Sequence, residues 1–109
     1  MDNQSYVRFL AKLNTTKPED IDREFIITFF LHDDNVLVYE PEQRNSGFAG
    51  GKFLEKGKYK NAQNNNQFFA PSDFLIGQDV VINGYSFHIN DCDEHTKKWY
   101  TGNYKPTNQ

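Results

Sequence analysis

The clearest structural signal in the sequence is the stretch Asp79-Val80-Val81-Ile82-Asn83-Gly84-Tyr85-Ser86-Phe87-His88-Ile89-Asn90. Asn83 and Gly84 both tolerate positive φ, so they predict a two-residue type I′ turn between two antiparallel strands. This turn pairs Asp79 with His88, and the alternation of side chains along each strand then fixes which residues share a face. The face expected to turn toward the core carries Val80, Ile82, Tyr85, Phe87 and Ile89.

Earlier parts of the chain also have strand patterns. Residues 6–13 alternate apolar and polar side chains, which is typical of a half-buried strand. Residues 24–31 are apolar on both faces, which predicts a strand covered on both sides. The turn residues at 33–35 then lead into a partner strand over residues 36–39. Residues 52–60 predict a further strand pair or one bent strand, with Gly57 as a candidate bulge.

Polar segments separate these strands. Residues 15–22 predict a polar connection that contains Pro18, and the Asn-rich residues 61–67 predict a loop without regular structure. Residues 68–74 predict an irregular turn around Pro71 that contains at most one helical turn.

A short helix is predicted at the end of the chain. Asp91 can cap it, and Glu94, three residues later, completes a capping box. Gly102 is suited to the position just after the helix. Many strands followed by one terminal helix indicate a mainly β fold with one C-terminal α-helix, of the pleckstrin-homology-like sandwich or barrel type. The helix face expected to pack on the sheet carries Cys92, Thr96 and Trp99.

Composition limits the class of protein. A length of 109 residues indicates one domain over residues 1–109, with its core over about 6–101. The net charge of −3 argues against a general nucleic-acid binder. No apolar run approaches the roughly 20 residues that cross a bilayer. The single cysteine, Cys92, cannot form an internal disulfide, which fits a reducing intracellular compartment.

The glycine-rich stretch around residues 46–53 has some features of a phosphate-binding loop but lacks its two diagnostic residues. Ser46 stands where the first glycine of a P-loop should be. Phe53 stands where a Ser or Thr hydroxyl would hold magnesium. The sequence therefore predicts no nucleotide site here.

Two ordered blocks of the sequence instead resemble the DM-ten (DM10) domain of ciliary and flagellar proteins. The first block contains Glu40-Pro41, Arg44-Asn45-Ser46-Gly47 and Gly50-Gly51-Lys52-Phe53-Leu54-Glu55-Lys56-Gly57. The second contains Ser72-Asp73-Phe74, Ile76-Gly77, Val80, Gly84, Phe87, Asp91-Cys92-Asp93-Glu94, Thr96 and Tyr100.

This resemblance implies a function as well as a fold. Such domains are repeated in EF-hand-containing ciliary proteins, including the protofilament-ribbon protein, and have a pleckstrin-homology-like fold. By resemblance we expect a non-catalytic module of a longer multi-domain protein in the axoneme of cilia and flagella. It would bind tubulin and other axonemal proteins and stabilise the doublet microtubule from its lumen. Two alternatives remain: a pleckstrin-homology-like lipid- or peptide-binding module, and the accessory domain of a nucleoside diphosphate kinase.

Basic side chains concentrate in one part of this acidic chain. They are candidate contacts to an acidic partner such as tubulin. Two other interpretations are a solvated strand edge that discourages strand pairing and a phosphoinositide site. The residues concerned are Arg44, Lys52, Lys56, Lys58 and Lys60.

The cluster of His88, Cys92 and His95 does not have the pattern of a metal or catalytic site. Zinc usually takes four thiolate or imidazole ligands in paired spacings. An EF-hand loop starting at Asp91 would need glycine where Thr96 stands and glutamate where Gly102 stands. We therefore expect no metal, no cofactor and no catalysis.

Overall fold

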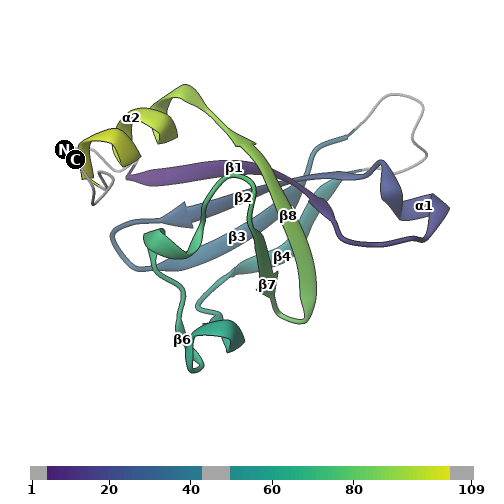
Figure 1. The fold of residues 1–109 in the computed structure, drawn as a ribbon, viewed down its shortest axis with the longest axis horizontal. Coiled ribbons are helices and arrows are strands. Elements are labelled where there is room, and N and C mark those ends of the chain that lie inside the picture. Colours follow the sequence, from purple (N-terminus) through teal and green to yellow (C-terminus); the bar gives the residue numbers. More distant parts are fainter. Residues whose placement is uncertain (1–4, 43–49, 104–109) are drawn as a thin grey trace.

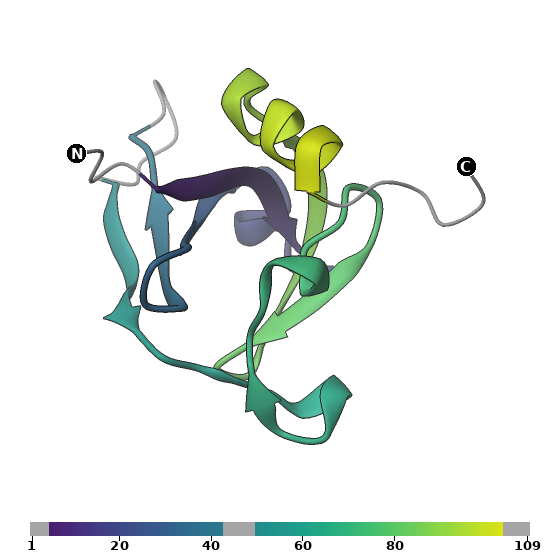
Figure 2. The ribbon, with the colours of Figure 1, turned by 90° about the vertical axis from the view of Figure 1, so that its left-hand side faces the viewer.

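The computed structural model describes residues 5–42 and 50–103, and its main feature is a curled antiparallel sheet (Figure 1). Within the described residues the sheet has six strands, in the order β4-β3-β2-β1-β8-β7. Figure 2 shows the strands curling round the core, with α2 at the top and the small β5–β6 hairpin at the bottom. The predicted class, mainly β with a C-terminal helix, is confirmed. The sheet strands are β1 (Tyr6–Leu13), β2 (Glu24–Phe30), β3 (Asn35–Glu40), β4 (Gly51–Gly57), β7 (Asp79–Ile82) and β8 (Tyr85–Cys92).

Shorter elements connect and cover these strands. None of the described helices is long and apolar enough to span a membrane. The elements are α1 (Pro18–Ile21), β5 (Lys60–Asn61), the 3-10 helix η1 (Ala62–Asn64), β6 (Gln67–Phe68), the 3-10 helix η2 (Pro71–Asp73) and α2 (Glu94–Asn103).

The concave face of the sheet holds the core, and much of it is aromatic. Phe74, which follows η2, is fully buried at the centre of a cluster of rings. Its ring centroid lies 5.4 Å from that of Phe9, 5.5 Å from that of Phe29 and 5.4 Å from that of Phe69. Because large rings bury much apolar area, this cluster allows a small domain to form a filled core.

The β7–β8 hairpin has the register that its turn predicts. Asn83 and Gly84 have φ of 51° and 85°, and Asp79 pairs with His88. The expected burial of Tyr85 is wrong, because its side chain is 43% exposed. The reason is that β1 pairs with β8 only as far as Phe87, so Tyr85 lies beyond the sheet's central part.

The prediction that β2 is covered on both sides holds only in part. Phe25, Ile27 and Phe29 on the concave face are fully buried, whereas Ile26 and Phe30 on the convex face are half-buried. Among the described residues, those that shield Ile26 and Phe30 on the convex face lie on neighbouring strands. The ring of Tyr6 on β1, for example, lies 6.3 Å from that of Phe30.

The segments predicted as a polar connection and as an unstructured loop both contain short regular elements. Residues 18–21 form α1, which begins with a proline at a position that suits it. Residues 60–68 form the β5–β6 hairpin around η1. Asn65 and Asn66 adopt left-handed φ of 57° and 58°, and the side chain of Asn61 accepts the Gln63 N–H at 3.0 Å. The asparagines therefore form the turn here, because asparagine tolerates positive φ and caps backbone donors.

Residues 52–60, predicted as a strand pair or one bent strand, belong to two strands, β4 and β5, which do not pair with each other. β4 ends at Gly57, which pairs with Val36, and the β3–β4 register shifts between Val36 and Val38. The irregularity expected near Gly57 is present at this end of the ladder. After a short connection, the chain continues as β5.

The helix begins two residues later than the sequence predicts. Asp91 stays in β8, pairs with Leu10 and accepts the Cys92 N–H at 2.8 Å. Asp93 is the residue that caps α2, since its Oδ1 accepts the Thr96 N–H at 2.8 Å. The proposed C-terminal position of Gly102 is also wrong, because the helix includes it. Trp99 packs against the core as expected, and Tyr100 and the fully buried Thr96 also lie on the docked side.

The cap can be tested by two matched substitutions. Asp93→Ala should lower the free energy of unfolding by about 0.5–2 kcal/mol, because it removes the acceptor for a helix N–H. Asp91→Ala removes the same carboxylate from an exposed strand position and should change it by about 0.5 kcal/mol or less. Urea denaturation of both variants measures the difference, and a larger loss for Asp91→Ala would show that the cap is misassigned.

The Asp79–His88 pair provides a test of the hairpin register by titration. His88 Nδ1 lies 2.7 Å from Asp79 Oδ1. Hydrogen bonds from His88 and then from Asn14 lower the pKa of Asp79 below its ordinary value of 3.8. The resulting stabilisation is present above the ordinary value and is lost as pH falls through the lowered one. NMR titration of the carboxyl carbon should show this lowered midpoint, and His88→Ala should raise it; an unchanged midpoint would contradict the pairing.

Candidate partner-binding surface

The predicted basic contacts lie along one edge of the sheet and the hairpin beyond it. Lys52 and Lys56 lie on β4, which is the end strand of the sheet order, Lys58 follows β4, and Lys60 lies on β5. All four are exposed, and we call them the basic strip. Arg44, the fifth predicted contact, lies outside the described residues.

Half of the basic strip is already paired within the chain. Lys52 Nζ lies 3.7 Å from Glu55 Oε1, and Lys56 Nζ lies 3.8 Å from Asp33 Oδ2. Lys58 and Lys60 have no acidic partner within the described part of the chain, so their charges are available to a partner. The strip therefore divides into a partly neutralised half on β4 and an uncompensated half at the β5–β6 hairpin.

Sequence reasoning missed an aromatic residue beside the uncompensated lysines. Phe68 on β6 is 48% exposed, and the register places it opposite Lys60. The Nζ atoms of Lys58 and Lys60 lie 5.5 and 5.7 Å from the centroid of its ring. The signal that could have revealed it was the turn chemistry of the asparagines, which sets up the hairpin.

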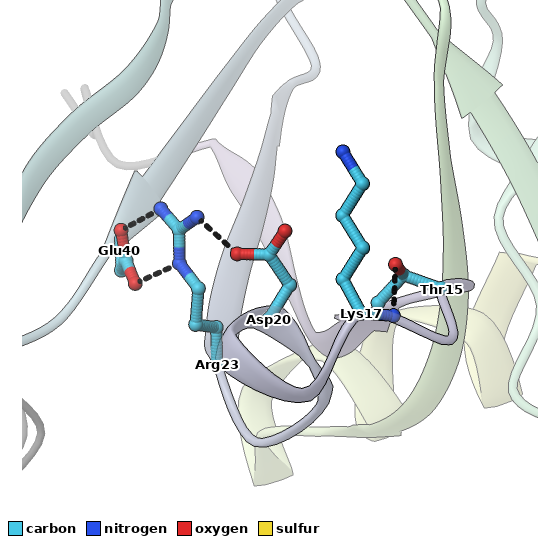
Figure 3. A network of polar contacts seen from close by, with 5 residues as sticks. All are labelled: Thr15, Lys17, Asp20, Arg23 and Glu40. Atoms are coloured by element: carbon cyan, nitrogen blue, oxygen red, sulfur yellow. Dashed lines mark hydrogen bonds and ion pairs between the residues drawn. The ribbon is translucent and has the colours of Figure 1, made fainter.

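A buried ion pair holds the base of the connection between β3 and β4 (Figure 3). Arg23 donates from Nε and Nη2 to the two carboxylate oxygens of Glu40, at 2.8 and 2.7 Å. Its Nη1 donates to Asp20 of α1 at 3.0 Å. Glu40 is only 7% exposed, and its hydrogen bonds are the main cause that raises the pKa of the Arg23 guanidinium. A fork-shaped pair of this kind fixes geometry as well as charge.

Glycine closes the same connection from its other end. Gly50 has φ of +80°, and a Cβ there would lie 2.7 Å from the backbone nitrogen of Glu42. Neither the backbone angle nor the space admits a side chain without strain. Glu40 and Gly50, both in the first family-like block, therefore have structural roles at the two ends of the connection between β3 and β4.

The His and Cys residues near the end of the chain are not arranged as a reactive centre. His88 is held by Asp79 on one side of the hairpin, and the His95 ring lies 6.2 Å from that of Tyr6. Burial raises the pKa of the Cys92 thiol, which disfavours the thiolate needed for nucleophilic attack. Across residues 5–42 and 50–103, no three His, Cys, Asp or Glu side chains are grouped so that they could hold a metal ion.

An apolar groove of about 430 Å³ lies between α2 and the segment after η2. Leu75 and Ile76, which are 49% and 48% exposed, form one wall, and α2 contributes Lys97 and Tyr100 to the other. The sequence did not indicate this groove, because its walls come from residues that are distant along the chain.

The fold defines a small, mainly β module with one C-terminal helix. The chain belongs to the DM10 domain family, whose model matches residues 1–96. It is 39% identical over 106 residues to EF-hand domain-containing protein 1 of Mus musculus. It is 44% identical over 96 residues to EF-hand domain-containing family member C2 of Gallus gallus. These matches cover 94% and 83% of this chain but only 16% and 13% of those proteins, so the chain corresponds to a small part of much longer relatives.

The Arg23–Glu40 ion pair predicts that substitutions of two nearby glutamates, Glu40 and Glu42, have different effects on the free energy of unfolding. Glu40→Gln should lower the free energy of unfolding by about 1.5–3 kcal/mol, because it weakens charged hydrogen bonds to a partly buried guanidinium. Glu42→Gln, at an exposed position two residues later, should change it by about 0.5 kcal/mol or less. Equal effects in urea denaturation would mean that the Arg23–Glu40 pair contributes no net stability.

Proposed function

We propose that this chain is a non-catalytic structural module that binds tubulin in the doublet microtubules of cilia and flagella. In this proposal it is one domain of a longer axonemal protein and stabilises the doublet from its lumen. The observation that carries the proposal is an uncompensated pair of lysines on an acidic chain of the DM10 family. Family membership supports the setting, and the basic strip supports an acidic partner.

A binding role accounts for the polar groups better than a catalytic one. The buried carboxylate of Glu40 is bound to Arg23, and His88 is bound to Asp79. Both pairs hold backbone elements together, and general acid–base catalysis would need such groups to be directed at a substrate. The accessible charges lie on the basic strip, where they can steer and orient a partner of opposite sign.

The basic strip can be tested by charge neutralisation against a matched control. Changing Lys52, Lys56, Lys58 and Lys60 to Gln should weaken co-sedimentation with microtubules several-fold, because rim charges set electrostatic attraction. Changing Lys12, Lys17, Lys98 and Lys105 to Gln removes the same total charge at other positions of the sequence and should leave binding within about twofold of wild type. An isolated domain can bind weakly without its neighbours, so the pair of variants should also be compared in the full-length parent protein.

Two outcomes in cells decide the location. The tagged full-length parent should be found in axonemes and should resist extraction by salt, as expected of a protein inside the tubule. Equal retention of the strip variant and the control would show that the lysines of the basic strip do not contribute to the contact. Release of the parent by detergent, with binding of the domain to phosphoinositide vesicles, would favour the lipid-binding alternative.

The apolar groove favours a second candidate function, a peptide-binding module. Its wall exposes two adjacent aliphatic side chains, Leu75 and Ile76, which are costly to leave in water unless a partner covers them. In that case Leu75→Ser with Ile76→Ser should abolish axonemal retention, whereas the strip variant should leave it unchanged. The accessory role in a nucleoside diphosphate kinase receives no comparable support, because the named relatives are EF-hand domain-containing proteins.

A further inference from the structure

We propose that the β5–β6 hairpin is a docking site for an acidic protein segment that carries an apolar side chain between carboxylates. Its contact residues are Phe68, Lys58 and Lys60. The inference deepens the proposed function and rests on it for the setting, but the chemistry of the partner is argued from the hairpin alone.

The β5–β6 hairpin projects from the domain, and its turn is held by a backbone hydrogen bond and by two residues in the left-handed conformation. It lies on the opposite side of the domain from α2 in both views (Figures 1 and 2). Its turn is closed by the bond from the Asn66 N–H to the Asn61 carbonyl at 3.0 Å and by the two left-handed asparagines, Asn65 and Asn66. A preformed turn loses little conformational entropy when a partner binds.

Phe69 anchors this hairpin to the core and so holds Phe68 outward. Phe69 is 1% exposed, its ring lies 5.4 Å from that of Phe74, and its N–H donates to the Tyr59 carbonyl at 3.2 Å. Adjacent side chains in a strand point to opposite sides, so burial of Phe69 directs Phe68 to solvent. An exposed ring in a fixed position is the kind of side chain that dominates binding energy at interfaces.

The charges around Phe68 define what can cover it. Two ammonium groups lie within 5.7 Å of the ring centroid, and no described carboxylate neutralises either of them. A cation–π contact at an exposed site is weak, so the ammonium groups can turn toward a carboxylate without losing much. A partner with carboxylates on both sides of an apolar side chain would satisfy both lysines and cover the ring.

A peptide is favoured over an anionic membrane. The described residues next to this site include the Asn-rich turn, and the chain as a whole has a net charge of −3. Stable attraction to an anionic bilayer typically takes a cluster of about four to eight basic residues. Lys52 and Lys56 of the basic strip are paired with Glu55 and Asp33, so two uncompensated charges remain, and these suit two carboxylates.

Peptide titration of the isotopically labelled 109-residue chain tests the site. The probes are three nonapeptides: Glu-Glu-Leu repeated three times, its Gln-Gln-Leu counterpart, and nonaglutamate. The Glu-Glu-Leu peptide should give saturable amide shifts at residues 58–60 and 67–69. The Gln-Gln-Leu peptide should bind about tenfold more weakly, because it lacks the charges, and nonaglutamate should also bind more weakly, because it lacks the apolar contact.

Matched variants separate this site from general charge attraction. Lys58→Gln with Lys60→Gln, and separately Phe68→Ala, should each weaken the Glu-Glu-Leu peptide about tenfold. Lys17→Gln with Lys98→Gln removes the same charge from exposed positions elsewhere and should leave binding within about twofold. The amide spectrum of each variant checks that it is folded, and Phe68→Leu, which keeps an apolar side chain, should retain more binding than Phe68→Ala.

Two sets of results would overturn the inference. One is the absence of peptide shifts at the hairpin, including shifts located only elsewhere, or equal losses for the site and control variants. The other is binding to phosphatidylserine vesicles that depends on Phe68, without binding to the peptides. Peptide binding at the hairpin without microtubule binding would refute tubulin as partner but not the site. Microtubule binding that depends on the lysines but is unchanged by Phe68→Ala, with no peptide shifts, would refute only this inference.

Discussion

The pairing of β1 with β8 joins the strands that come first and last along the chain, in the middle of the sheet. The arrangement of the other elements depends on this pairing. Its ladder runs from Leu13 opposite Phe87 to Phe9 opposite Cys92, with an irregularity between Leu10 and Ala11. Where the ladder ends, the Thr96 hydroxyl of α2 accepts the N–H of Arg8 at 2.8 Å. The helix thus satisfies a backbone donor that a longer β8 would otherwise have paired, as buried backbone groups require. This contact fixes α2 beside β1, and with it one wall of the apolar groove.

The same curled sheet positions the surface that we propose for partner binding. The core cluster around Phe74 receives Phe69 from the hairpin and Phe9 and Phe29 from β1 and β2. The ring of Phe69, which anchors the hairpin, is therefore part of the domain's main core. The exposed ring of Phe68 is held in position by this neighbour. A loop of this polarity would otherwise be an unfavourable place for a binding residue, because ordering it would cost conformational entropy.

The residues that carry the family resemblance are mainly structural in this fold. Glu40 binds Arg23, Gly50 lies against the Glu42 backbone, and Gly84 completes the hairpin turn. Each has a backbone or burial reason that is independent of any partner. The proposed contacts at the β5–β6 hairpin lie instead in the segment between the two family-like blocks. The residues that carry the family resemblance are thus different from those of the hairpin site, although Lys52 and Lys56 of the basic strip belong to the first block.

Features that depend only on residues close together in the chain follow from the amino-acid sequence alone. Alternation of apolar and polar side chains located β1, a segment apolar on both faces located β2, and Asn83-Gly84 set the β7–β8 register, because periodicity and turn chemistry act over a few residues. Tertiary structure decided the rest. Asp91 has good capping chemistry, yet pairing with β1 holds it in a strand and leaves the cap to Asp93. The exposure of Tyr85, the uncompensated state of Lys58 and Lys60, and the outward direction of Phe68 depend on which distant residues lie nearby, and a local pattern contains no record of those contacts.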